Sequence, residues 1–290
     1  MLATRPIKRP ETIRDSFRGM ALIAVLWLVA ALSIVLGSLS AAMRQETRMM
    51  SAKREMVVAQ AFGDAAIQLV LQKLRAADRA PDTWAQVAVE YEGRQVQVQI
   101  VPLSGLIDLN RADAPLLSRM LSVAGGLSPD GALTTAQAII AARQQRDSAG
   151  ALFRFEAEED LMKVPGITYD LYARLIPLLT VEGRGSSKVN PNAAPVPVLA
   201  VLAHGNQRVA EVIHSKRIEG AVGIDMSGLD ASLTDTSVSS RAKLTAIIPL
   251  DSVSFAHVSR VVDVATVAAD GSPWVTFRLS SSLKIAPSRN

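Results

Sequence analysis

The sequence contains no cysteine, few aromatic residues and only three histidines. Without cysteine, the chain has no disulfide bonds, no thiolate ligands for a metal and no thiol nucleophile. Six Phe, three Trp and three Tyr leave small aliphatic side chains to build most of any core. At 290 residues, the chain is long enough for one large domain or two small ones.

Most of the chain also has no excess of either positive or negative charge. The formal net charge is +4, and residues 1–19 hold five basic residues against two acidic ones. The remaining residues hold 26 basic and 25 acidic side chains. Because nucleic-acid-binding domains present a basic surface, this balance gives no indication of such a surface on the folded body.

Sequence patterns typical of enzymes and metal sites are not found. There is no G-x-S-x-G nucleophile elbow and no paired-acid arrangement, and GRGSSK (183–188) lacks the spacing of a phosphate-binding loop. His204, His214 and His257 do not share a helix face suited to a metal. The acidic run at 156–160 is typical of a solvated helix start. We expect neither a catalytic residue nor an enzyme.

One segment lacks charge altogether. Met20 to Met43 is a run of 24 residues without a charged side chain. As a helix it would be about 36 Å long, enough to cross a hydrocarbon core of about 30 Å. Basic residues precede it and the long polar part follows it, so the positive-inside rule places the N-terminus in the cytoplasm. We expect a single-pass inner-membrane protein with a periplasmic C-terminal domain.

The start of this run carries a processing signal. An ordinary secretory signal has an apolar region of about 7–15 residues before a small-residue cleavage site, and Ser-Ala-Ala at 40–42 offers such a site behind a longer run. The junction Arg18-Gly19-Met20 instead resembles a prepilin leader. That resemblance implies cleavage between Gly19 and Met20 by a prepilin peptidase and N-methylation of Met20. Most pilin-like proteins have Glu at the fifth mature position, where this chain has Ala24.

The segments on either side of residues 105–220 indicate one antiparallel sheet. The helix continues from the membrane to about residue 80, with Val58, Phe62, Ala65 and Leu69 on one face, Ala66 and Val70 beside them, and Pro81 ends it. Alternating Val and Ile around Glu92-Gly93-Arg94 predict a hairpin over 87–100. Further strands are predicted at 244–250, 257–269 and 274–283, after a loop rich in Ser, Thr and Asp.

Residues 105–220 read as short helices with an internal repeat. IDLNRADAPLL (107–117), the first copy, matches VNPNAAPVPVL (189–199), the second copy. Asx side chains and an early Pro favour a helix start in each copy. More helices are predicted at 135–146, 156–164, 168–179 and 206–217. The matched pairs are Ile107/Val189, Asp108/Asn190, Asn110/Asn192, Ala112/Ala194, Pro115/Pro197 and Leu117/Leu199.

The order of these features resembles the minor pseudopilin K family of type II secretion systems. The resemblance rests on the Arg18-Gly19-Met20 junction, the missing Glu at Ala24, the two repeat copies, LMKVPGITYDLYARLIPLLTV (161–181) and the late hairpin. The resemblance implies an α+β fold: a pseudopilin fold, with a long N-terminal transmembrane helix plus an antiparallel sheet, and an inserted all-helical domain. It implies a protein that initiates and caps the periplasmic pseudopilus tip with minor pseudopilins I and J and other pseudopilins.

Six segments follow from this interpretation. They are a leader peptide (1–19), the N-terminal helix (20–80, transmembrane over 20–43), the first part of the pseudopilin sheet (81–104), the inserted helical domain (105–220), a loop or linker (221–244) and the C-terminal part of the sheet (245–290).

Calcium and DNA are the two alternatives that the sequence raises. Some members of the family bind calcium, but Asp225, Asp230 and Asp235 have no EF-hand-like spacing, so we expect no metal and no cofactor. LMKVPGIT resembles the helix-hairpin-helix of membrane-anchored DNA-uptake receptors, which present amides and basic residues to a phosphate. Here Lys163 is the single close base and Asp170 is an acid at the same hairpin, so we expect no nucleic acid.

Overall fold

The computed structural model describes residues 14–77, 80–146, 150, 152–221 and 223–285. Two compact units divide the chain, Met1–Val57 and Val58–Asn290. Helix α1 (Arg14–Ala76) contains residues of both. Its apolar side chains between Leu22 and Ile34 are exposed, with Leu22 at 74% and Trp27 at 72%. Within the described part of the chain, no helix contains a run long and apolar enough to cross a membrane.

In the second unit, the end of α1 packs on a sheet through small side chains. Ala66 and Val70, which were predicted beside the Val58 face, are buried, whereas Val58 itself is 40% exposed, so the buried face lies one residue later along the helix than predicted. Gly63 explains the difference: a Cβ there would lie 2.7 Å from Cβ of Val258, so only glycine allows this close approach. Asp64 adds an ion pair of 2.8 Å with Arg260. The buried residues are Ala59, Ala66, Ile67, Val70 and Leu71.

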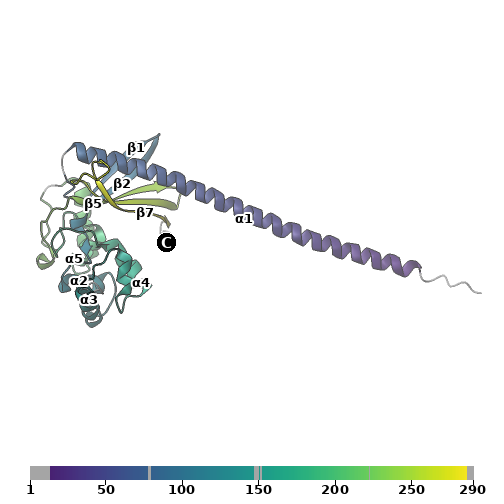
Figure 1. Cartoon of the computed structure of the whole chain (residues 1–290), viewed down its shortest axis with the longest axis horizontal. Helices are drawn as coiled ribbons and strands as arrows, with labels where there is room; N and C mark the ends of the chain where they lie inside the picture. Colours follow the sequence, from purple (N-terminus) through teal and green to yellow (C-terminus); the bar gives the residue numbers. More distant parts are fainter. Residues whose placement is uncertain (1–13, 78–79, 147–149, 151, 222, 286–290) are drawn as a thin grey trace, which may run out of the picture. The chain divides into compact units, whose positions relative to one another are not determined.

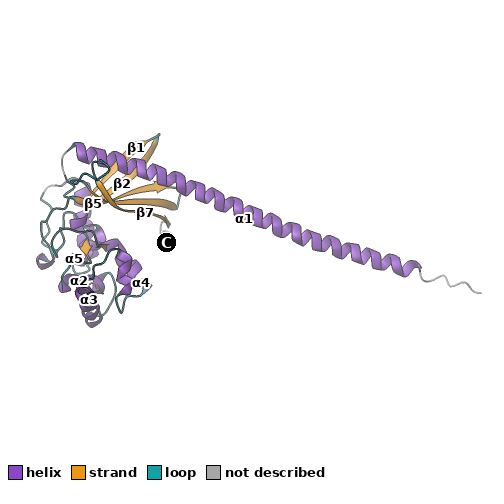
Figure 2. Ribbon diagram, viewed as in Figure 1, coloured by secondary structure: helices purple, strands orange, loops and turns teal. Residues whose placement is uncertain are grey.

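The sheet has five antiparallel strands in the order β1-β2-β5-β6-β7. The predicted early hairpin is confirmed, with the two-residue turn Glu92-Gly93, both at positive φ, as a tight hairpin requires. Figure 2 shows the strands in orange, separate from most of the helices. The strands are β1 (Ala85–Tyr91), β2 (Arg94–Pro102), β5 (Arg241–Pro249), β6 (Ser254–Asp263) and β7 (Val275–Ile285).

The segment between β2 and β5 holds the short helices, several of which are labelled in Figure 1. It is not purely helical, because β3 (Ile107–Asp108) pairs in parallel with β4 (Leu179–Thr180). Whether it is a domain inserted into the sheet stays a prediction. Its α-helices are α2 (Ala114–Val123), α3 (Pro129–Gln144), α4 (Tyr169–Leu175), α5 (Val196–Leu202) and α6 (Gln207–Ile218). Its 3-10 helices are η1 (Leu103–Gly105), η2 (Glu158–Lys163), η3 (Ile176–Leu178) and η4 (Ala231–Leu233).

Several elements differ from their predicted bounds for local reasons. The helix predicted at 156–164 is the shorter η2, because the Asp160 carboxylate accepts hydrogen bonds from the amides of Glu156 and Ala157 and closes a tight turn. Helix α3 begins at Pro129, since the Ser128 hydroxyl accepts from the amide of Gly131. Strand β5 begins at Arg241, within the predicted linker, and α1 ends at Ala76.

The elements of the helical segment share one hydrophobic core. It contains apolar residues from both repeat copies and from the helices that follow them. Fully enclosed side chains in it include Ile107, Leu109, Leu116, Leu117, Met120, Leu121, Ile139, Phe155, Leu161, Val189, Val198 and Leu199. Because the copies share this core, each fixes the position of the other.

Candidate processing and assembly sites

The predicted processing junction lies on α1. Gly19 and Met20 are helical in backbone, and Ala24 falls in the exposed stretch that follows them. Most of the predicted leader, residues 1–13, lies outside the described residues. Cleavage between Gly19 and Met20, N-methylation and the role of Ala24 therefore stay predictions.

The two repeat copies have the same local geometry. In the first, the Asp108 carboxylate accepts a hydrogen bond of 2.8 Å from the Asn110 amide. In the second, the Asn190 side chain accepts one of 2.9 Å from the Asn192 amide. Each turn leads into a helix with Pro in its first turn, α2 or α5. The sequence repeat is thus a structural repeat of one turn followed by one helix.

A half-buried arginine completes each copy. Arg143 of α3 donates a hydrogen bond of 2.8 Å to the carbonyl of Ala112, and Arg217 of α6 donates one of 2.7 Å to the carbonyl of Ala194. Burial lowers the pKa of Arg143, although the charge of Asp108 opposes this; burial lowers the pKa of Arg217 to about 10. Sequence reasoning missed both arginines, and their only signal was a basic residue late in the helix after each copy.

Asparagines extend this network across the helical segment. The Asn110 side chain donates to the carbonyls of Phe155 and Val181 at 3.0 and 3.2 Å, and it accepts from the Phe155 amide at 2.9 Å. Asn190 donates to the carbonyl of Ser237 at 2.9 Å. These side chains satisfy backbone groups of distant loops, so their role is structural.

The hairpin around Pro165-Gly166 offers little to a phosphate. Lys163 forms an ion pair of 2.7 Å with Asp160. Burial alone would raise the pKa of Asp160, but hydrogen bonds from Lys163 and two backbone amides lower it overall. The side chains that do face solvent include Met162, 43% exposed, and Tyr169, 73% exposed. Such a surface suits contact with a protein better than contact with a nucleic acid.

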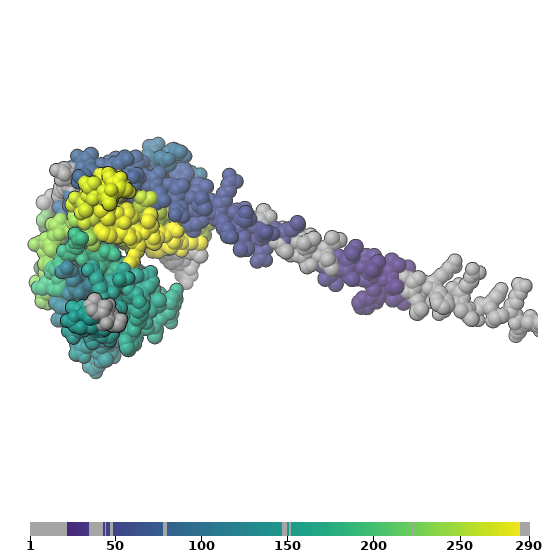
Figure 3. Space-filling view, viewed as in Figure 1, coloured from purple at the N-terminus to yellow at the C-terminus, as the bar shows by residue number. Residues whose placement is uncertain are grey.

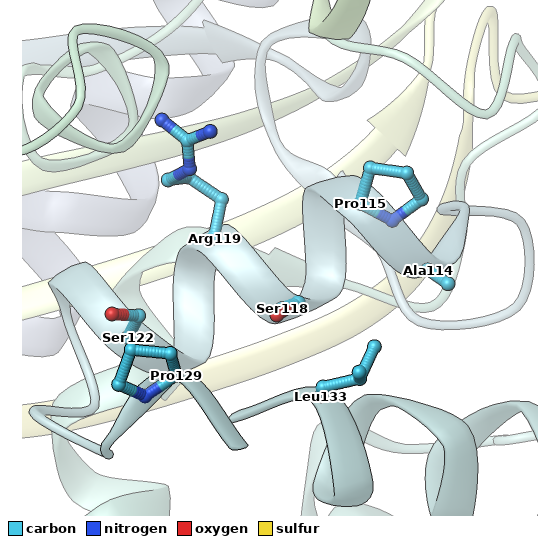
Figure 4. Close-up of a pocket in the computed structure, with 7 residues that line it drawn as sticks. All are labelled: Ala114, Pro115, Ser118, Arg119, Ser122, Pro129 and Leu133. Atoms are coloured by element: carbon cyan, nitrogen blue, oxygen red, sulfur yellow. The ribbon is translucent and has the colours of Figure 1, made fainter. Parts of the chain in front are cut away.

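A shallow pocket of about 360 Å³ lies beside α2 and the start of α3 (Figure 4). In the figure, Leu133 extends toward α2 near Ser118, and Arg119 extends away from Leu133. Arg119 is the one charged residue that lines the pocket, and it pairs with Asp230 at 3.7 Å and contacts His204. The lining is therefore small and weakly polar, which favours an apolar side chain from another protein. It consists of Ala114, Pro115, Ser118, Arg119, Ser122, Pro129 and Leu133.

The loop acids that raised the question of calcium each serve a turn of their own. Asp225 accepts a hydrogen bond from the amide of Ser227, Asp230 from that of Ser232 and Asp235 from that of Ser237. In the part of the chain that the structure describes, no group of three or more His, Asp or Glu side chains is placed to hold a metal ion. The expectation of no cofactor stays a prediction.

The three histidines occupy separate places. His204 contacts Arg119 and lies 3.4 Å from Asp230. His214 packs edge-on against Trp84, with ring centroids 4.4 Å apart, and burial followed by the charge of Arg217 lowers its pKa. His257 lies on β6.

Comparison with known proteins adds a weak structural similarity. No protein-family model matches the chain, and no curated protein is significantly similar to it. Among solved structures, it is similar to a chain from the crystal structure of the GspK–GspI–GspJ complex of the enterotoxigenic Escherichia coli type 2 secretion system. The TM-score is 0.47 and the sequence identity 13%, over 82% of this chain and 99% of that chain. A similarity this weak does not establish a shared function.

Proposed function

We propose that the chain is a minor pseudopilin of a type II secretion system, in the position that the K subunit occupies. The observation that carries the proposal is an order of features. A charge-free run at 20–43 follows Arg18-Gly19 directly, and the same helix ends on a five-stranded antiparallel sheet whose second and third strands are separated by a helical segment. A protein of this kind needs no catalytic residue, since it acts by membrane anchoring and surface contact.

In this proposal the precursor is a single-pass inner-membrane protein with a cytoplasmic N-terminus and a periplasmic head. A prepilin peptidase removes residues 1–19 and methylates Met20. The mature protein then assembles with minor pseudopilins I and J to initiate and cap the pseudopilus tip. The exposed, weakly charged surfaces at the Figure 4 pocket and at Met162 and Tyr169 support contacts with proteins rather than with DNA.

The mature N-terminus tests the processing step. Mass spectrometry of the membrane-bound protein should find a chain that begins at N-methylated Met20. Gly19→Leu should leave uncut precursor, because a bulky residue does not fit where a small one enters the protease. Cleavage near Ala42, or no cleavage, would overturn the prepilin interpretation.

Binding to purified partners tests the assembly step and separates it from DNA uptake. The head, from about residue 44 onward, should form a complex with minor pseudopilins I and J and should not bind DNA. DNA binding at micromolar concentration, with an affinity that falls steeply with salt, would instead favour a membrane-anchored uptake receptor.

Ala24 allows a test of the proposed tip position. A lone acid near the middle of a membrane costs about 2.5–3.5 kcal/mol on insertion scales, so an acid there needs a partner. A subunit with Ala24 needs no amine from an earlier subunit, which suits the first subunit in line. Ala24→Glu should still insert and be cleaved but should lower secretion. Full secretion, with the variant still at filament tips, would show that Ala24 does not set the position.

A further inference from the structure

A groove separates one face of the sheet from the helical segment. It encloses about 490 Å³, within the range of about 300–1,000 Å³ typical of ligand pockets. Its floor comes from β2, β5, β6 and β7, and its opposite wall from η2, η3 and the start of α5. Figure 3 shows β7 (yellow) beside the helical segment (teal) on one face of the molecule.

The floor of the groove carries cations in a polar setting. Strand pairing places Lys243 opposite Val261, Thr245 opposite Ser259 and Ile247 opposite His257, so alternate residues of β5 and β6 share this face. From β7, Ser280, Ser282 and Lys284 line the same groove. Thr245 and Ser259 hydroxyls lie 2.9 Å apart. The floor thus combines four basic side chains with several hydroxyl donors; Arg278 of β7 pairs with Glu158, which leaves Lys243, His257 and Lys284.

Lys243, His257 and Lys284 lack acidic partners. Among the described residues, no carboxylate forms an ion pair or hydrogen bond with Lys243, His257 or Lys284. Burial, followed by repulsion from Lys284, lowers the pKa of both Lys243 and His257. The half-buried charge of Lys243 beside the charge of Lys284 is costly to keep, and an anion bound in the groove would relieve that cost and favour the protonated form of His257.

The opposite wall restricts the class of anion. Glu158 lies there and pairs with Arg278, and Glu159 lies beside it. The rest of the wall is apolar, formed by Ile176 and three prolines. A nucleic acid, with a phosphate on every nucleotide, would meet these carboxylates. A peptide that alternates acidic and apolar residues would meet cations and hydroxyls on one side and apolar side chains on the other.

We propose that this groove binds an acidic peptide segment of a partner protein, whose carboxylates pair with Lys243 and Lys284 and accept a hydrogen bond from His257. Only the identity of the partner rests on the proposed pseudopilin function. Peptide binding itself does not depend on cleavage at Gly19, so the proposed function and this inference are tested separately.

The probe is a capped nine-residue peptide that alternates Glu and Val, measured by fluorescence polarisation with the full chain in mild detergent. A matched peptide with Gln in place of Glu should bind at least about tenfold more weakly, because it lacks the charges that pair with the floor. Lys243→Gln combined with Lys284→Gln should weaken binding of the Glu peptide to a similar extent. Lys216→Gln, at an exposed position on α6, is the control and should leave binding unchanged.

A stability measurement separates a loss of peptide binding from a loss of folding. Lys243→Met removes an unpaired, half-buried charge, so it should raise the melting temperature while weakening peptide binding. A lower melting temperature would mean that Lys243 supports the fold. Equal binding of the Glu and Gln peptides, unchanged binding by the double variant, or tighter binding of a single-stranded oligonucleotide of equal charge would each overturn the proposal.

Discussion

The two repeat copies form the same turn and helix, but one uses a charged side chain and the other a neutral one. In each, an Asx side chain closes a turn, a helix follows, and an arginine from the helix after that one donates to a carbonyl of the copy. The first copy uses Asp108, whose charge lies near Arg143. The second uses the neutral Asn190, and no nearby acid opposes the effect of burial on the pKa of Arg217.

This difference shows that the turn, rather than the charge, is the common requirement. Asp108 and Asn190 are both buried, at 7% and 3% exposure. Burial raises the pKa of Asp108 against the effects of the Asn110 amide and three arginines. Asn190 makes the same turn without that desolvation and uses its amide group to bind the Ser237 carbonyl instead. A neutral Asx residue is therefore sufficient, because the second copy forms the same turn beside the half-buried Arg217 without an acid.

The largest expected effect comes from the shared core. Leu117→Ala and Leu199→Ala each remove a fully buried side chain, and each should lower the free energy of unfolding by about 2–5 kcal/mol. Because both side chains belong to one core, the two losses should be similar. Urea denaturation of the full chain measures them. A loss at one site several times larger than at the other would mean that the copies are not equivalent in packing.

A second comparison concerns the residue two positions before each copy. A Cβ on Gly105 would lie 2.2 Å from backbone atoms of Ala193, so Gly105→Ala forces the copies apart and should cost roughly 2–3 kcal/mol. The matching position before the second copy is Ser187, which already holds a side chain. Ser187→Ala is the control and should change stability by less than about 0.5 kcal/mol. Equal effects in thermal melts would refute the close contact.

The repeat illustrates what sequence can predict here. Matching letters at fixed offsets identified both turns and helix starts, and Glu92-Gly93 identified the early hairpin, because these depend on local backbone chemistry. The buried face of α1 was displaced by one residue, with Ala66 and Val70 correctly placed, because Gly63 and small alanines, rather than Val58 and Phe62, set the closest approach to the sheet. Strands β3 and β4 have only two residues each, too few to show a period.

The candidate sites were less predictable than the fold. Gly19, Met20 and Ala24 were chosen from sequence, and their roles stay predictions. The groove could not have been found from sequence, because Lys243, His257 and Lys284 come from three strands that only pairing brings together. Their spacing along the chain carries no motif, and alternate polar residues on a strand are equally typical of an ordinary solvated sheet face.

A third prediction exchanges the Asx residues. Asn190→Asp keeps the acceptor for the Asn192 amide but loses the donor to Ser237 and places a buried carboxylate against that carbonyl, at a cost of about 2 kcal/mol. The introduced acid should have a raised pKa. Its cost should therefore be full at neutral pH and shrink as the pH falls toward about 4, where the unfolded carboxyl also begins to protonate.

The reverse exchange is the matched control. Asp108→Asn keeps the turn, removes a costly buried charge and also removes the charge that favours protonated Arg143, so its effects oppose each other. The net change should stay below about 1 kcal/mol. Denaturation midpoints at several pH values compare the two variants. A larger loss for Asp108→Asn than for Asn190→Asp would show that the charge, and not the turn, is what the first copy requires.

The smallest effect concerns how the two helices begin. Asp113 caps α2 by accepting a hydrogen bond of 3.1 Å from the amide of Leu116, whereas the matching position before α5 is Pro195, which makes no such bond. Asp113→Ala should cost about 1 kcal/mol, the usual value of a lost N-cap. Pro195→Asp offers a side-chain acceptor to the Val198 amide, which already donates to the carbonyl of residue 195 at 3.0 Å, and it loses the restriction that proline places on the unfolded chain, worth about 0.4–1 kcal/mol. The two contributions nearly cancel, so this variant should be within about 0.5 kcal/mol of the parent chain.

Thermal melts of both variants decide between two explanations of Pro195. A gain near 1 kcal/mol would mean that proline contributes little there and the second copy is only poorly capped. A loss of that size would mean that proline rigidity does for α5 what the Asp113 carboxylate does for α2.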